Sequence, residues 1–93
     1  MQVVIFGSTK ERAFNKWQDI LNNMRFGDVD KVMYDWGVFV LTNGDVYKAV
    51  TGNDGARGYR CDYAYIDRFI SVDIMNKVII PCLKQENGSF EFY

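Results

Sequence analysis

The feature that most constrains the fold is an apolar run near the start of the chain, followed at once by a glycine and a helical pattern. Residues 2–6 read Gln-Val-Val-Ile-Phe, a run short enough for a buried strand. Its lack of alternation is typical of strands buried on both faces, as in parallel sheets covered by helices. Gly7 ends the run, and Ser8 stands three residues before Glu11, the spacing of a capping box that opens a helix. We therefore expect a strand–turn–helix unit here.

Two helices are expected. In the first helix, apolar residues recur at helical spacing with charged residues between them. The apolar residues are Ala13, Phe14, Trp17, Ile20, Leu21 and Met24. Gly27 is a natural C-terminal stop for this helix. Ser71 can cap the second helix, and Pro81 is expected to end or kink it.

The remaining strands follow from alternation and turn signals. Residues 31–36 alternate, and Gly37 permits a bend before the apolar run 38–42. Asn43-Gly44 predicts a type I′ hairpin turn that joins this run to residues 45–50 as antiparallel strands. Residues 63–67 read as another buried strand, 84–88 as a polar turn, and 90–93 as a short last strand.

These elements predict one small α/β domain over residues 1–93. We expect a mixed four- to five-stranded sheet with two main helices, in the order β-α-β-β-β-β-α-β.

Composition excludes several classes of function. The net charge of −1 provides no global attraction to nucleic acid or an anionic membrane. The chain has no histidine, which excludes histidine-based zinc sites, Ser-His triads and histidine acid–base catalysis. Cys61 and Cys82 lack metal-ligand spacing and are expected to be buried thiols. No apolar run is long enough to span a membrane, and the start of the chain does not resemble a signal peptide, so a cytoplasmic location is expected. Trp17 and Trp36 are expected in the core.

A glycine-rich segment carries the most distinctive residues. Residues 51–58 include three glycines with Asn53 and Asp54, which predicts a mobile loop. The candidate interaction residues at its end are Arg57, Gly58, Tyr59 and Arg60. Arginine beside an aromatic ring suits phosphate contacts and base stacking, and equally a protein interface. It also suits a solvated loop whose tyrosine packs on the sheet. Asp54 and Asp62 flank the two arginines and reduce the local positive charge, which disfavours nucleic-acid binding.

Four segments together resemble the middle part of the ATPase domain of tailed-phage large terminase subunits, the motors that package DNA. Residues 3–9 with the following helix resemble the strand and helix after the phosphate loop of that family. Residues 38–50 resemble its hairpin, and residues 56–67 resemble the approach to its Walker B strand. Residues 69–83, with the sequence Ile-Pro-Cys-Leu near their end, resemble the helix that follows. The resemblance implies that Asp67 corresponds to the aspartate that helps to hold magnesium in those enzymes.

The departures from the family remove its chemistry. The chain has no G-x-x-x-x-G-K-[ST] phosphate loop, and Arg68 stands where the family carries a catalytic acid. The turn of Gly7, Ser8, Thr9 and Lys10 is a possible anion-binding turn at a helix N-terminus, although helix capping already accounts for Ser8. Asp67 is expected to cap the next turn or to pair with Arg68 or Arg60. We therefore expect no catalytic residues, no metal site and no cofactor, with magnesium-nucleotide as the less favoured alternative.

Three functions stay open besides an enzyme, which ranks last because the sequence offers no nucleophile, base or phosphate cradle. The first is a non-catalytic relative of the packaging motor that binds another protein, or a second copy of itself, as a regulator or inhibitor. The second is a small nucleic-acid-binding module that uses the Arg57–Arg60 loop with Lys10 and Arg12. The third is a phage inhibitor of a host defence or replication factor, which would act in the host cytoplasm. A membrane partner is not expected.

Overall fold

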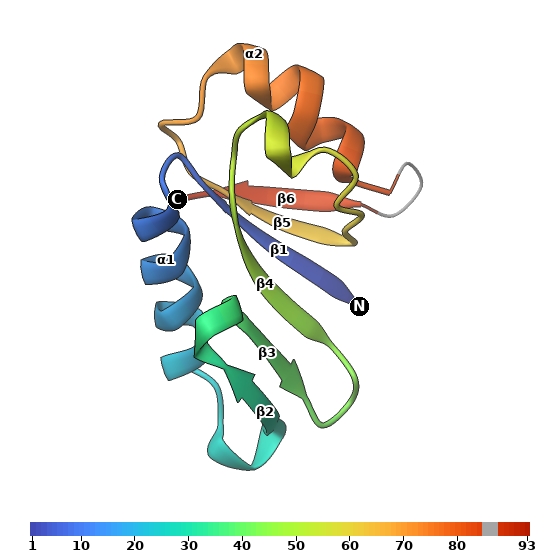
Figure 1. Cartoon of the computed structure of the whole chain (residues 1–93). Coiled ribbons are helices and arrows are strands. Elements are labelled where there is room, and N and C mark those ends of the chain that lie inside the picture. Colours follow the sequence, from blue (N-terminus) through green and yellow to red (C-terminus); the bar gives the residue numbers. More distant parts are fainter. Residues whose placement is uncertain (85–87) are drawn as a thin grey trace.

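The computed structural model describes residues 1–84 and 88–93. It is a mixed six-stranded sheet in the order β2-β3-β4-β1-β5-β6, with helices on both faces (Figure 1). The strands are β1 (Gln2–Gly7), β2 (Val29–Met33), β3 (Val38–Leu41), β4 (Val46–Thr51), β5 (Tyr63–Ile66) and β6 (Ser89–Phe92). The α/β class and the two main helices are confirmed, and all six strands belong to one sheet, one or two more than expected.

β1 lies at the centre of the sheet because it is the most apolar strand. It pairs in parallel with β4 on one side and β5 on the other, and five of its six residues are buried. β5 continues in parallel to β6, whereas β2, β3 and β4 form an antiparallel meander. The sheet therefore joins a parallel half to an antiparallel half at β4.

Helix α1 (Lys10–Asn22) covers one face of the sheet. Its residues Trp17 and Leu21 pack on Val3, Ile5 and Phe39. The predicted limits of this helix were wrong at both ends. Thr9, not Ser8, is the N-cap, since its hydroxyl accepts a hydrogen bond from the Arg12 amide. The helix ends at Asn22 instead of continuing to Gly27, which lies in a 3₁₀ turn, Phe26–Asp28.

The other face is covered by a second helical segment and a 3₁₀ turn, Asp54–Ala56. The helical segment starts with α2 (Val72–Ile74) and continues with a π-helical and a 3₁₀ turn as far as Cys82. Ser71 caps it as predicted, by accepting a hydrogen bond from the Ile74 amide. Pro81 lies in the last turn and the helical segment ends one residue later.

Three further predictions about local structure can be compared with the fold. The hairpin of β3 and β4 is confirmed, but its turn is not type I′, because Gly44 has a positive φ of 94° and Asn43 does not. The strand predicted for residues 31–36 stops at Met33, and Tyr34–Trp36 forms a 3₁₀ turn before Gly37. The predicted polar turn 84–88 falls mainly on residues outside the described ones.

The two cysteines are buried free thiols on the face that α2 covers, as predicted. Burial raises the pKa of the Cys61 thiol to about 12. Trp17 lies in the core as expected, but Trp36 is 72% exposed, so its predicted core position was wrong. No helix in the described parts of the chain is long and apolar enough to cross a membrane.

The closest approach between β1 and α1 provides a test of this packing. A Cβ added at Gly7 would overlap the backbone of Ala13 and lie 2.6 Å from the Thr9 carbonyl oxygen. We expect Gly7→Ala to lower the free energy of unfolding by about 1–3 kcal/mol, because the strand and helix must separate. Urea denaturation measures the change.

Gly27→Ala is the matched control, since a Cβ there meets nothing within 4 Å. It should change the free energy of unfolding by no more than about 0.5 kcal/mol. Equal effects of the two substitutions would contradict the close packing of β1 on α1.

Candidate binding groove

Asp67 follows β5 directly and is the one buried charged residue in the described parts of the chain, with an exposure of 1%. Its Oδ2 accepts hydrogen bonds from the Ser8 amide (2.8 Å), the Ser8 hydroxyl (2.6 Å) and the Arg12 Nε (2.7 Å). Its Oδ1 accepts from another Arg12 nitrogen (3.0 Å) and from the Phe69 amide (3.1 Å). Five donors on four groups therefore surround one carboxylate.

This environment fixes the ionisation state of Asp67. Burial opposes the charged form, but the hydrogen bonds from Arg12, Ser8 and Phe69 outweigh it and hold the pKa of the carboxyl well below its usual range. The Arg12 side chain is 40% exposed and its guanidinium also lies 4.7 Å from the centre of the Phe69 ring. The pair is a bidentate ion pair at the carboxyl ends of β1 and β5.

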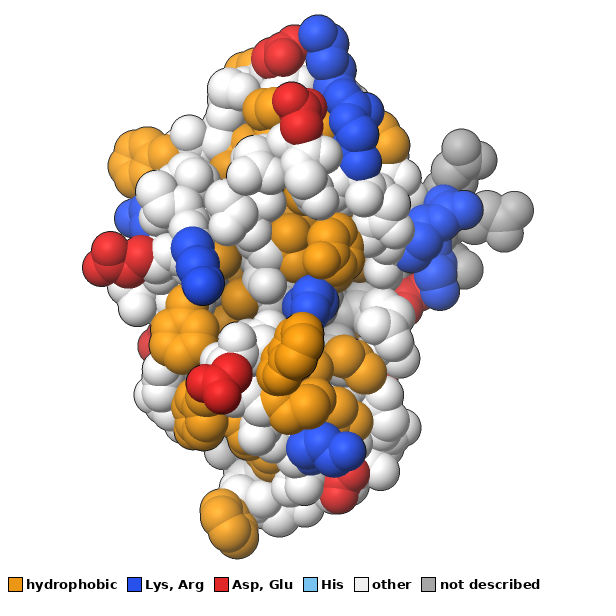
Figure 2. Space-filling view, viewed as in Figure 1, with side chains coloured by type: hydrophobic (Ala, Val, Ile, Leu, Met, Phe, Trp, Pro, Cys, Tyr) orange, Lys and Arg blue, Asp and Glu red, His pale blue; other side chains and the backbone are white. Residues whose placement is uncertain are grey.

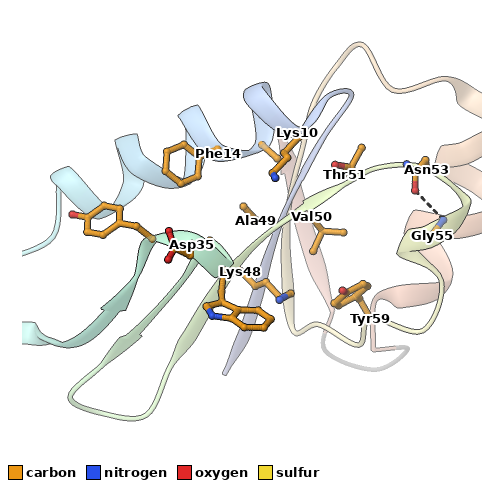
Figure 3. A pocket seen from close by; sticks show the side chains of 14 residues that line it. Lys10, Phe14, Asp35, Lys48, Ala49, Val50, Thr51, Asn53, Gly55 and Tyr59 are labelled. Carbon is orange, nitrogen blue, oxygen red and sulfur yellow. Dashed lines mark hydrogen bonds between the residues drawn. The ribbon is translucent and has the colours of Figure 1, made fainter.

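The pair corrects two sequence-based predictions. Asp67 caps the next turn as expected, through the Phe69 amide, but its cationic partner is Arg12 instead of Arg68 or Arg60. The residues of the possible anion-binding turn have three separate roles. Ser8 donates to Asp67, Thr9 caps α1, and Lys10 projects toward β4 (Figure 3). An internal carboxylate thus takes the Ser8 donors that an external anion would need.

The arginine-containing segment lies beside a shallow depression that Arg57, Arg60 and Lys77 line together. Arg57 bonds weakly to Asp54 and to the Lys77 carbonyl oxygen, both at 3.4 Å. Gly58 has a positive φ of 89°, which turns the chain between Arg57 and Tyr59. Arg57 and Arg60 border a shallow depression next to Pro81, whereas Tyr59 also faces a different groove.

That groove, of about 320 Å³, is the candidate site (Figure 3). It lies beside the second half of β4, between α1, the Tyr34–Trp36 turn and the segment after β4. Its lining residues include Lys10 and Phe14 from α1, Tyr34, Asp35 and Trp36 from the turn, Lys48 and Thr51 from β4, and Asn53 and Tyr59 from the loop. Figure 2 shows hydrophobic side chains gathered in the middle of this face, with basic ones among them.

Three aromatic rings of the groove are open to solvent. Trp36 is 72% exposed, Tyr34 54% and Tyr59 36%. The Tyr34 ring makes an edge contact with Trp17 beneath it, at 5.8 Å between centroids. Gly37 adopts the left-handed conformation with φ 59°, which ends the 3₁₀ turn and leads the chain into β3. The fold thus places these rings at the surface.

Positive charge exceeds negative charge around the groove. Lys10 and Lys48 contribute two ammonium groups and Asp35 one carboxylate. The Lys48 ammonium lies 5.8 Å from the centre of the Tyr59 ring. Neither lysine forms a salt bridge with any residue in the described ranges 1–84 and 88–93.

Sequence reasoning found Lys10 and Tyr59 but missed the rest of the groove. Tyr34, Asp35 and Trp36 were read as part of an alternating strand, although the Gly37 that follows them was a signal for a change of direction. Among the described residues, His, Cys, Asp and Glu form no cluster of three or more that could hold a metal ion. Comparison of this sequence with protein-family models, with curated proteins and with solved structures gave no match.

The Asp67 ion pair predicts a large loss of stability on removal of its charge. Asp67→Asn places an amide NH₂ among donors and leaves Arg12 without its carboxylate. We expect the free energy of unfolding at pH 7 to fall by about 2–4 kcal/mol. The control is Asp73→Asn, which removes an exposed pair with Lys77 and should leave stability nearly unchanged. Wild-type stability of Asp67→Asn would show that the pair contributes nothing.

The same carboxyl predicts a specific response to acid. Because the folded-state pKa of Asp67 lies below that of the unfolded chain, its contribution is complete above about pH 4 and is lost as the pH falls further. The difference in unfolding free energy between wild type and Asp67→Asn should therefore narrow below about pH 4. Urea titrations at several pH values measure this difference in unfolding free energy. A difference that does not change with pH would contradict a lowered folded-state pKa of Asp67.

Proposed function

We propose that this protein is a non-catalytic binding protein that recognises a protein partner through the groove beside β4. The observation that carries the proposal is Trp36, a tryptophan with 72% of its surface exposed next to an exposed Tyr34. Tryptophan, tyrosine and arginine are the residues most enriched among those that dominate binding energy at protein interfaces. Exposed aromatic side chains that line one groove are therefore more informative than a scattered surface ring.

The residues with potential for catalysis are otherwise engaged, which supports binding over an enzymatic role. Asp67, the carboxylate that a magnesium site would use, is occupied by Arg12, Ser8 and Phe69. Cys61 and Cys82 are buried, away from the groove. The polar groups of the groove are Lys10, Lys48, Asp35, Thr51 and Asn53, which suit hydrogen bonding and charge recognition.

Nucleic-acid binding is less well supported. Arg12, one of the basic residues that such a module would use, is committed to Asp67, and Arg57 lies close to Asp54. Lys10 and Lys48 near aromatic rings would still accept a single strand by stacking and charge. Nucleic acid is therefore an outcome that the experiment below must distinguish.

The resemblance to the packaging ATPase stays a prediction, and so do a phage origin and a role as a regulator or an inhibitor of a host factor. Binding through the groove does not depend on them.

Site-specific crosslinking tests the proposal. The photoreactive amino acid benzoylphenylalanine replaces Trp36 in one variant and Phe26 in another, each expressed in cells that carry this gene. Phe26 is the matched control because it is 98% exposed and outside the groove. We expect a discrete protein adduct from position 36 and none from position 26. The partner should then bind Trp36→Ala at least about thirtyfold more weakly than wild type, the loss of an interface hot spot, and Phe26→Ala normally.

Other outcomes count against the proposal. Equal adducts at both positions, or none at position 36, would show that the groove is not the interface. An adduct that nuclease treatment removes would show that the partner is a nucleic acid and not a protein.

A further inference from the structure

The second half of β4 is an open sheet edge inside the groove. The pairing of β3 with β4 ends where Val38 lies opposite Lys48. One more hydrogen bond follows, from the Ala49 amide to the Gly37 carbonyl oxygen (2.8 Å). The chain before Gly37 then turns away into the Tyr34–Trp36 turn, so the described strands leave Thr51 without a neighbour on this side.

Two backbone groups on this edge have no partner among the described residues. The amides of Val46 and Gly52 donate toward β1, so alternate residues Ala49 and Thr51 direct their backbone groups to the opposite side. The Gly37 amide, which would have reached the Ala49 carbonyl, donates instead to Tyr34 (3.2 Å). The Ala49 carbonyl and the Thr51 amide therefore remain free. This acceptor and this donor flank Val50 and bracket one residue of an added strand.

The walls of the groove determine what fits this edge. Phe14 and Lys10 approach β4 from α1 on one face, and Tyr59 lies on the other face (Figure 3). An added strand would run between these walls, with successive side chains directed to opposite faces. Trp36 provides apolar contact at the end of the edge, and Lys10 and Lys48 provide unbalanced positive charge.

We infer that the groove binds an extended, acidic peptide segment of the partner, which adds a strand to β4 through the Ala49 carbonyl and the Thr51 amide. Backbone hydrogen bonds supply part of the affinity, and the aromatic walls and lysines supply specificity for apolar and acidic side chains. The inference rests on the proposed function and specifies the kind of segment that the groove recognises.

The probe is a set of linear dodecapeptides selected from a random phage-displayed library on the wild-type protein. We expect the selected sequences to be enriched in Asp and Glu next to apolar residues. Thr51→Pro removes the amide hydrogen that the strand would use, and this hydrogen has no partner in the described fold. It should weaken binding of a selected peptide about five- to tenfold, the loss of one hydrogen bond in a recessed site. Thr51→Ala, which retains the amide and loses only the groove-lining hydroxyl, is the matched comparison, and Thr51→Pro should bind at least about fivefold more weakly than Thr51→Ala.

Two further measurements test strand addition without relying on the folding of the proline variant. In wild-type protein, exchange of the Thr51 amide hydrogen, followed by NMR, should slow when the peptide binds. Two sets of peptides carry N-methyl groups on alternate residues, and the two sets are offset by one residue. One set should lose binding and the other should keep it, because only alternate residues of the added strand face β4.

The possible failures are distinguishable. If selected peptides lose binding with Trp36→Ala but bind Thr51→Pro as well as wild type, with no protection of the Thr51 amide, the groove is the interface and strand addition is wrong. If Trp36→Ala and Phe26→Ala bind the peptides equally, the proposed function itself fails. Selection of basic or uncharged sequences would contradict the acidic assignment.

Discussion

The carboxylate of Asp67 holds together the carboxyl end of the parallel half of the sheet. It joins two distant parts of the chain, since Ser8 after β1 and Arg12 in α1 lie 59 and 55 positions from Asp67, whereas Phe69 follows it after β5. Removing a charge from water is costly unless every lone pair finds a donor, and here five donors meet that requirement. The pair ties the first turn of α1 to the end of β5, in addition to the packing of Trp17 and Leu21 on the sheet. The helix that carries Lys10 and Phe14 at the groove is therefore anchored at its start by an interaction outside the groove.

The same pair occupies the place in the sheet where a ligand would be expected. In open α/β sheets, ligands bind at the carboxyl ends of the strands where successive connections leave on opposite faces. Here β1 leads into α1 on one face and β5 leads into α2 on the other, so that point lies between β1 and β5. Arg12 and Asp67 fill it with an internal ion pair. The groove lies on the other side of β1, where β4, its parallel neighbour, extends past the start of β3, and this is the site that we propose for recognition.

The sequence contained the elements but not the long-range pairings. Residues 2–6, the β3–β4 hairpin and the Ser71 cap were predictable because their signals are local: an apolar run, an Asn-Gly turn and a capping serine. The partner of Asp67 was not, because Arg12 is 55 positions away and pairs with it only after β1 and β5 align. The exposure of Trp36 was missed for a related reason. Its alternating neighbours suggested a strand, whereas its position depends on how Gly37 turns the chain against Ala49.

The edge strand β6 and the free part of β4 differ in what they can accept. β6 is exposed along its whole length, and Phe90 and Phe92 pack edge-on against each other on one side of it. Glu91 stands between them, held by the Tyr63 hydroxyl at 2.6 Å, so antiparallel pairing of two copies centred on this strand would bring like charges together. This is a common protection of sheet edges against self-association. The free part of β4 has no such charge of its own. It lies in the groove between α1 and Tyr59, and these walls restrict what can approach it. This restriction is why we propose a single extended segment, and not a second sheet, as the strand that pairs with it.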